Sequence, residues 1–293
     1  MALTLSQIEA RVDAAGRHPG RAFVRRHPLL VIGGALLALM ALIAFLAPWV
    51  APYSPIEMSV LKRLKPPSST NFFGTDAMGR DVFSRVLWGG RVSLGVGMSV
   101  ALLATIVGVM MGMVAGFSRT ADAVIMRVMD GMMAIPGILL AVAMMALMRA
   151  SIQTVVIAIA VPEIPRVVRL VRSLVLVIRE QPYVQAAEAI GTRFHWILLR
   201  HVLPNALTPL IVQGTFICAS AVLFEAYLSF LGAGTPPEIP SWGNMMAEGR
   251  AVVQLAFNII LFPGIFLGLT VLSINLLGDG LRDMLDPKIA RRL

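Results

Sequence analysis

Six stretches of the chain contain no Asp, Glu, Lys or Arg and are almost entirely apolar. They cover residues 28–56, 92–118, 131–148, 150–162, 201–224 and 251–278. A helix needs about 20 mostly apolar residues to cross the hydrocarbon core of a membrane. The pattern therefore predicts an all-α polytopic membrane protein with about six transmembrane helices. The fourth stretch is short, so it spans only if its helix continues through Pro162 and Pro165. Within the second stretch, Gly108, Gly112 and Gly116 share a helical face, which predicts close packing against another helix.

Composition supports the membrane interpretation. Apolar residues make up 57% of the 293 positions and charged residues 14%, whereas soluble domains have about 45–50% and about 25%. This balance excludes a soluble enzyme, a secreted domain and a disordered tail. A single cysteine, Cys218, excludes a disulfide framework or a cysteine-rich zinc site within this chain. The formal net charge of +9 comes from cations spread between the apolar runs, so we expect no nucleic-acid partner.

The distribution of cations predicts the topology. With a cytoplasmic N-terminus, 17 Lys and Arg residues lie in cytoplasmic segments and 8 in external ones, and the positive-inside rule then favours both termini in the cytoplasm. The chain divides into a cytoplasmic N-terminal segment (1–28), a first transmembrane helix with an external loop (29–90), a transmembrane core (91–280) and a cytoplasmic tail (281–293). The core contains a long cytoplasmic segment between helices four and five, residues 181–204.

This cytoplasmic segment has the pattern of a short helix followed by a second one. Pro182 suits the first turn of a helix and Gly191 suits a left-handed exit. Four apolar residues are spaced to form one stripe, namely Tyr183, Ala186, Ala187 and Ile190, and the other face carries Gln181, Gln185 and Glu188. Thr192 is placed to cap a second helix, which we expect to end at Pro204. From the residues alone, the segment either docks in the groove of a partner or lies on the lipid surface.

Three acidic residues interrupt or border the apolar stretches. We expect functional roles for Asp130, Glu163 and Glu225, because a charge inside a membrane is energetically costly and is seldom present without a function. Each either faces the pathway or pairs at a helix end, with Arg127, Arg166 or another helix. Glu163 is the first pathway candidate because prolines on both sides free backbone carbonyls beside it, and Glu225 is the second. An ion-coupled secondary transporter or channel would use these acids, although such proteins usually show an internal repeat that this sequence lacks.

The external segment before the second stretch forms a compact polar block, residues 73–85. Gly74 and Gly79 allow tight turns. Asp76, Arg80, Asp81 and Arg85 are close enough in sequence to pair with one another, which would make a structural staple; direct contact with substrate or a binding protein is the alternative. On this topology Pro240 and Trp242 are also external, where they suit a stiff gate or a docking rim.

The cytoplasmic segment resembles the EAA loop of ABC importer membrane subunits. That pattern is Glu-Ala-Ala, three residues, Gly, nine residues, Ile, one residue and Leu-Pro. Aligned on Gly191, it places Gln185, Ala186 and Ala187 at the Glu-Ala-Ala positions and Leu203 and Pro204 at its end. Gln185 stands where the family has an acid and His201 where it has Ile, while Glu188 lies one helical turn away. The resemblance implies that this segment docks on an ATPase.

Further blocks resemble the permeases of dipeptide, oligopeptide and nickel importers. These are residues 73–85, 228–232, 240–245, 275–283 and 285–287, which follow the family's order over residues 20–290. The resemblance is closest to the second of the two paired permeases, and it implies a type I ABC importer permease fold in the bacterial inner membrane. It also implies a complex with a homologous second permease, two cytoplasmic ABC ATPases and an external solute-binding protein.

The sequence lacks the motifs of an enzyme. None of its three lysines, Lys62, Lys65 and Lys288, follows a glycine, so no phosphate-binding P-loop is present. The four histidines form no His-Glu-x-x-His pair, and no Gly-x-Ser-x-Gly turn occurs. We therefore expect a non-catalytic subunit that binds no cofactor or metal, with ATP and Mg used by the partner ATPases that the resemblance implies. The resemblance leaves dipeptides, oligopeptides, glutathione and nickel chelates open as substrates.

Overall fold

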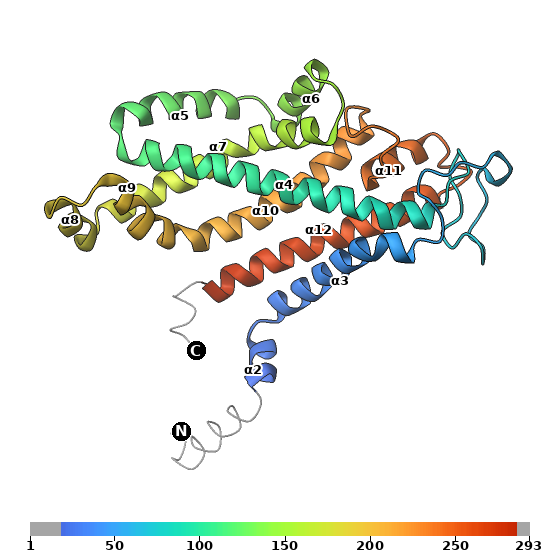
Figure 1. The fold of residues 1–293 in the computed structure, drawn as a ribbon, viewed down its shortest axis with the longest axis horizontal. Coiled ribbons are helices and arrows are strands. Elements are labelled where there is room, and N and C mark those ends of the chain that lie inside the picture. The colour runs from blue at the N-terminus through green and yellow to red at the C-terminus, as the bar shows by residue number, and fades with distance from the viewer. Residues whose placement is uncertain (1–18, 286–293) are drawn as a thin grey trace, which may run out of the picture.

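The computed structural model describes residues 19–285, and the regular elements of that part are helices apart from one isolated bridge between Thr75 and Asp81. The elements are α2 (Pro19–Arg26), α3 (Pro28–Val50), η1 (Val60–Lys62), α4 (Val82–Phe117), α5 (Arg119–Met133), α6 (Gly137–Leu147), α7 (Ile152–Arg179), α8 (Pro182–Ala189), α9 (Phe194–Ile197), η2 (Leu198–Val202), α10 (Leu203–Phe230), α11 (Trp242–Arg250) and α12 (Asn258–Leu285). Figure 1 shows the long helices side by side, with α8 and α9 at one end. The prediction of an all-α fold is confirmed for these residues.

Several predicted spans are present as long helices. In the part of the chain that the structure describes, α3, α4, the run Leu198–Phe230 and α12 are long and apolar enough to cross a membrane. The bent pair α5–α6 makes a fifth candidate. Helix α7 continues through Pro162 and Pro165 to Arg179, as the fourth span requires, but its charges lower its apolarity. The total of six spans therefore stays a prediction.

The third predicted span is not one straight helix. Residues 131–148 were expected to cross the membrane in a single piece, but α5 ends at Met133 and α6 begins at Gly137, with a bend of 90° between them. Pro136 explains the break, because proline lacks a backbone N–H and disfavours helical conformation in the residue before it. The span is a bent pair that folds back beside α7 (Figure 1).

Glycines bring α4 and α7 into close contact, as the sequence predicts. A Cβ added to each glycine would meet a valine Cβ at 2.5–2.7 Å: Gly108 with Val167, Gly112 with Val171, and Gly116 with Val175. The residue numbers of the glycines on α4 and of the valines on α7 increase in the same direction, so the two helices run parallel. Because any larger side chain would collide, the glycines fix the distance between the helices and the register of one on the other.

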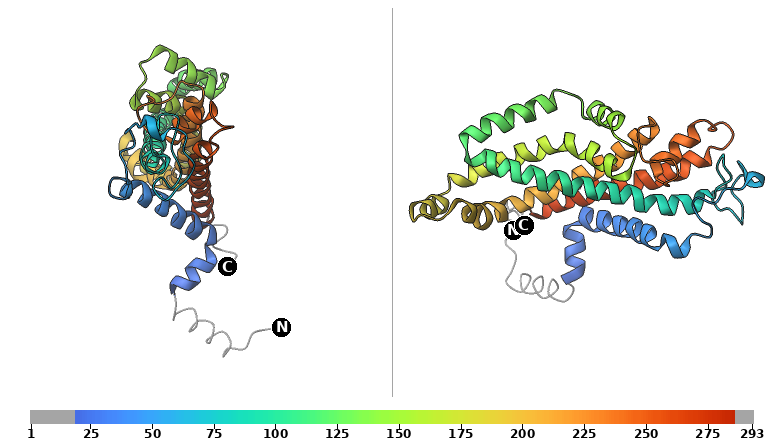
Figure 2. Two further views of the ribbon diagram at one scale, coloured as in Figure 1. Left: turned by 90° about the vertical axis from the view of Figure 1, so that its right-hand side faces the viewer. Right: turned by 45° about the horizontal axis from the view of Figure 1, so that its top comes forward.

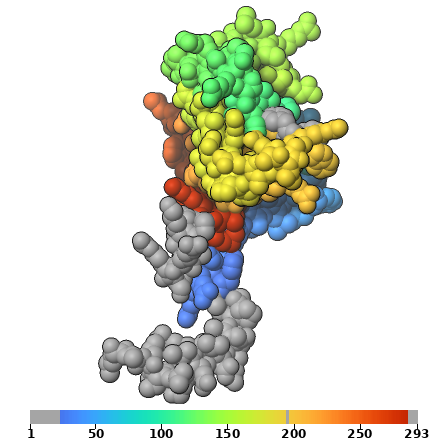
Figure 3. Space-filling model, turned by 90° about the vertical axis from the view of Figure 1, so that its left-hand side faces the viewer, coloured from blue at the N-terminus to red at the C-terminus, as the bar shows by residue number. Residues whose placement is uncertain are grey.

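Helix α3 packs antiparallel on α12, and Figure 2 shows the two lying together at one side of the molecule. Gly33 lies against the backbone of Leu276 and Leu277, and Gly280 lies against Leu30. The start of α3 and the end of α12 are therefore neighbours, as two cytoplasmic termini require. Figure 3 looks onto this end of the helices, where the segment around α8 forms much of the surface. Which side of the membrane it faces stays a prediction.

Candidate functional site

The predicted first cytoplasmic helix is present as α8, with the predicted boundaries. Pro182 occupies its first turn and Gln181 precedes it in an extended conformation. Gly191 has φ +81°, the left-handed conformation that glycine adopts without strain. The amide of Thr192 donates to the carbonyl of Ala187 at 3.0 Å and closes the helix end.

The buried face of α8 differs from the predicted stripe. The buried side chains are Val184 and Ala187, whereas Tyr183, Ala186 and Ile190 are exposed, Ile190 by 83%. The helix is oriented by its contacts with α7 and α9, so its buried face contains only Ala187 of the expected stripe together with Val184, which was not predicted. Three of the four predicted stripe residues are therefore uncovered in this chain. The polar residues Gln181, Gln185 and Glu188 are exposed as well.

The second predicted helix of the 181–204 segment does not end at Pro204. Helix α9 passes through the π-helical turn η2 directly into α10, and Pro204 lies in the first turn of α10. A proline is tolerated there because the first-turn N–H groups have no partner within the helix. The amide of Leu203 donates to the carbonyl of Leu198, which closes a wide π-helical turn directly before Pro204. Leu203 and Pro204 thus join the cytoplasmic segment to a membrane-length helix without a break.

Tyr183 connects α8 to the start of α10. Its ring centroid lies 5.8 Å from that of His201, and the side-chain amide of Asn205 donates to its hydroxyl at 3.4 Å. A displacement of α8 is therefore passed to α10 through side-chain contact as well as through the chain.

At the opposite end, the predicted polar block forms an ion network. Asp76 accepts from Arg80 Nε at 2.6 Å and from Arg85 Nη1 at 2.5 Å, and all three side chains are buried. Gly74 and Gly79 have φ +77° and +76°, which confirms the tight turns. The predicted pairing is confirmed for Asp76, Arg80 and Arg85.

Asp81 caps α4 and does not pair with the arginines. It caps the helix by accepting from the backbone amide of Ser84 at 2.8 Å, and it also accepts from Asn71 Nδ2 at 2.8 Å. A capping carboxylate satisfies an otherwise unpaired N–H and interacts favourably with the helix dipole. Asp81 therefore fixes where the loop ends and α4 begins.

Glu248 on α11 is a member of the network that the sequence did not indicate. It accepts from Arg80 Nη2 at 2.5 Å and from Arg85 Nη1 at 2.7 Å. In the sequence the block has two acids and two arginines, so its charges balance and gave no signal of a further partner. Only the structure shows that Asp81 caps α4 and that Glu248 is the second acid in contact with the arginines. Glu248 ties the external loop to α11.

Trp242 lies in the packed interior and not on an exposed rim. Its indole Nε1 donates to the carbonyl of Val86 at 2.9 Å, and the side chain lies over Gly89 and Gly90 of α4. Pro240 is half-buried in the turn before α11. The structure thus places Trp242 as an anchor that holds α11 on α4.

The three acids near the membrane stretches all have partners. Glu163 is buried and pairs with Arg166 at 3.0 Å, one of the predicted pairings. Asp130 pairs with Arg169 at 2.6 Å, from a helix other than its own. Glu225 is fully buried on α10 and its two oxygens accept from Ser93 at 3.2 Å and Ser229 at 3.0 Å. Neither buried glutamate presents its own carboxylate at the surface of the chain.

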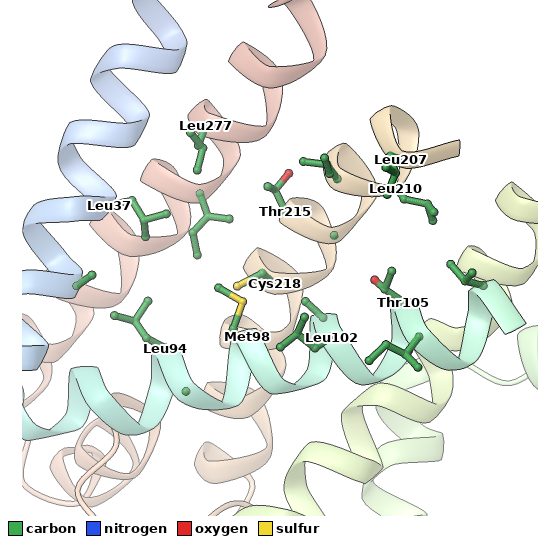
Figure 4. Close-up of a pocket in the computed structure, with 18 of the residues that line it drawn as sticks. Leu37, Leu94, Met98, Leu102, Thr105, Leu207, Leu210, Thr215, Cys218 and Leu277 are labelled. Atoms are coloured by element: carbon green, nitrogen blue, oxygen red, sulfur yellow. The ribbon is translucent and has the colours of Figure 1, made fainter. Parts of the chain in front are cut away.

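An apolar groove of about 800 Å³ runs between α3, α4, α10 and α12 (Figure 4). Its lining includes Leu94, Met98, Leu102 and Leu207. Thr105 and Thr215 contribute the hydroxyl groups in the lining. The groove therefore suits a hydrocarbon or protein neighbour and offers no charged group to a polar solute.

Comparison with known proteins identifies the family. The family model described as "Binding-protein-dependent transport system inner membrane component" matches residues 81–291, and the model "N-terminal TM domain of oligopeptide transport permease C" matches residues 23–67. The chain belongs to the family of binding-protein-dependent transport inner membrane components. It is thus a multi-pass transport subunit of the bacterial inner membrane.

Relatives with similarity over nearly the whole chain include three with printed substrates. The chain is 49% identical over 294 residues, 100% of both chains, to "Probable peptide ABC transporter permease protein y4tQ" of Sinorhizobium fredii. It is 42% identical over 267 residues, 91% of this chain and 88% of the other, to "Dipeptide transport system permease protein DppC" of Alkalihalophilus pseudofirmus. It is 40% identical over 271 residues, 92% and 90% of the two chains, to "Glutathione transport system permease protein GsiD" of Pectobacterium atrosepticum.

Proposed function

We propose that this chain is one permease subunit of an ABC importer that carries small peptides into the bacterial cell. The observation that carries the proposal is the 49% identity along the entire chain to a protein named as a peptide permease. The relative named for glutathione fits the same substrate class, because glutathione is itself a tripeptide.

The proposed complex contains a homologous second permease, two cytoplasmic ATPases and an external solute-binding protein. This chain binds no cofactor; ATP and Mg are used by the ATPases. The exposed residues Tyr183, Ala186 and Ile190 on α8 support an ATPase contact, because they leave apolar surface uncovered at one end of the molecule. Closure of the ATPase pair would move α8. ATP would shift the permease between its inward-open and outward-open states only by the difference in its affinity for those two states.

The first experiment isolates the tagged chain from native membranes and measures peptide uptake by the purified complex in liposomes. We expect a second permease and P-loop ATPases to co-purify, and a radiolabelled dipeptide to accumulate only with ATP and the binding protein. Uptake by the chain alone without ATP would overturn the proposal in favour of an ion-coupled transporter.

A second experiment tests the coupling role of α8. Ala187 is a poor target because it is buried, so an arginine there would disturb the fold of α8 itself. Ala186→Arg instead places a charge on the exposed face, and we expect it to abolish ATP-driven uptake while the subunit still inserts. Thr120→Arg is the matched control, since Thr120 is exposed on α5 near the same end of the molecule. Normal uptake by Ala186→Arg would remove this face from the mechanism.

A further inference from the structure

A row of charged side chains follows one face of α7 and continues onto α5. Two ion pairs join the helices and a third lies within α7: Arg169 with Asp130, Arg172 with Asp122, and Arg166 with Glu163. The arginines recur at every third position, so they lie along one side of the helix. No other described surface of the long helices carries such a row.

The contact with α4 fixes the depth of this row in the membrane. Val167 and Val171 of α7 lie against Gly108 and Gly112 of α4. On α4 these glycines fall inside the charge-free residues 92–118, which are long enough to fill the hydrocarbon core. Because α4 and α7 run parallel, Arg166 and Arg169 lie level with the part of α4 around these two glycines, inside its charge-free stretch.

The charges at this depth are only half covered by the chain itself. The side chains of Arg166, Arg169 and Asp130 are 54%, 45% and 57% exposed. Charged groups of a transmembrane segment face a water-filled cavity or another protein rather than lipid, because hydrocarbon cannot solvate them. The face of α5 and α7 therefore borders water or a charged partner in the assembled transporter.

The face that carries the apolar groove has the opposite character. Leu102 of α4 lies in this groove and is 55% exposed, as much as Arg166. The groove lining contains no charged residue. The two faces are thus equally exposed but opposite in polarity, which indicates that the charged α5–α7 face, and not the apolar groove, contacts water.

We propose that the α5–α7 face lines the aqueous pathway and binds the charged termini of the peptide, Arg166 and Arg169 taking the α-carboxylate and Asp130 the α-ammonium group. This proposal rests on the peptide import proposed above. Arg166 uses only Nη1 for Glu163, and Arg169 only Nη2 for Asp130, so each guanidinium keeps donors for a carboxylate. A zwitterion can replace the Arg169–Asp130 pair, because it brings one charge for each partner.

The test uses the assembled transporter in inside-out membrane vesicles, with Cys218 replaced by Ala in every variant. Ser173→Cys is the reporter, because Ser173 is exposed on the same side of α7, one turn beyond Arg169. Met110→Cys is the matched control, because Met110 lines the apolar groove at nearly the same level of α4 and is 59% exposed. A negatively charged, membrane-impermeant thiosulfonate is applied, and its labelling is read on the band of this chain. Uptake of a radiolabelled dipeptide is measured first in the Cys218→Ala background.

We expect the reagent to label Ser173→Cys and to leave Met110→Cys unlabelled. A dipeptide with a free carboxylate should slow the labelling, while its C-terminal amide should not. Adding Arg166→Gln should raise the dipeptide concentration needed for half-protection by about tenfold to a hundredfold, as expected for loss of a charge-assisted hydrogen bond.

Two results would overturn the proposal. Labelling of Ser173→Cys no faster than that of Met110→Cys would show that the face is covered by protein, as in an interface with the second permease. If the dipeptide and its C-terminal amide slowed the labelling of Ser173→Cys equally, the face would line an aqueous pathway but would not recognise the carboxylate. Loss of ATP-driven dipeptide uptake in the Cys218→Ala background, with normal labelling, would instead count against the peptide as substrate.

Discussion

Glu248→Ala is the substitution that most directly tests the external ion network. In the structure Glu248 and Asp76 together neutralise Arg80 and Arg85, both of which are buried. Removing Glu248 leaves two buried guanidinium groups sharing one carboxylate. Arg85 already has one unpaired nitrogen, Nε, so the loss cannot be absorbed by rearranging the remaining bonds.

The expected cost follows from the burial of the partners. Removing one member of a buried pair typically destabilises a protein by about 3–5 kcal/mol. Glu248 is 26% exposed, and water can partly solvate the freed arginine atoms, so we expect about 3 kcal/mol, at the lower end of that range. At about 2–4 °C per kcal/mol, the unfolding midpoint should fall by roughly 6 °C or more.

Thermal unfolding of the purified complex in detergent measures this change. Glu238→Ala is the matched control, because Glu238 is an exposed acid in the loop that leads to α11, and its midpoint should stay within the range of surface substitutions, about 0.5 kcal/mol. In a double-mutant cycle, Arg80→Ala should add less to Glu248→Ala than it costs alone. A Glu248→Ala midpoint equal to that of Glu238→Ala would refute the view that this network holds α11 in place.

Three further substitutions are read out in the same unfolding assay. Gly112→Val places a Cβ 2.7 Å from that of Val171 and should cost about 1–3 kcal/mol of stability through overpacking. Adding Val171→Ala should restore part of the lost stability. Gly131→Ala is the control, because a Cβ at Gly131 lies in open space and should be tolerated. Asp81→Ala removes the cap of α4 and should cost about 1 kcal/mol; an unchanged midpoint would contradict the capping role. Glu225→Ala should destabilise by about 2 kcal/mol more than Glu225→Gln, which keeps the volume and a hydrogen-bond acceptor, and equal midpoints would argue against the buried hydroxyl contacts.

Local chemistry accounts for what the sequence could predict. Charge-free runs located the long helices, because hydrocarbon excludes charge from the lipid-facing surface. Gly74 and Gly79 predicted tight turns, and Pro182 and Gly191 predicted the two ends of α8. Each of these features depends on a few neighbouring residues. Pro136 carried a similar signal, and the bend between α5 and α6 was open to prediction from it.

Contacts between distant segments account for what the sequence could not predict. Glu248 meets Arg85 across 163 residues, and no spacing rule connects two positions so far apart. The orientation of α8 is set by the helices it contacts, so the pattern could not tell which of Ala186 and Ala187 would be buried. The pairing of half-exposed Arg169 with Asp130 depends likewise on the position of α5 beside α7.

The charges on α7 have a consequence for how the protein is made. An arginine at the centre of a helix opposes membrane insertion by about 2.5–3.5 kcal/mol, and α7 carries several arginines while α4 and α12 carry enough apolar surface to insert unaided. Asp122 and Asp130 lie on α5, which leaves the ribosome before α7 and can neutralise Arg172 and Arg169 as that helix enters the membrane. A subunit synthesised without its assembly partners would still expose charge to lipid. In the proposed complex, biogenesis of the chain would therefore be tied to assembly, and quality control would recognise an unassembled copy by that exposed charge.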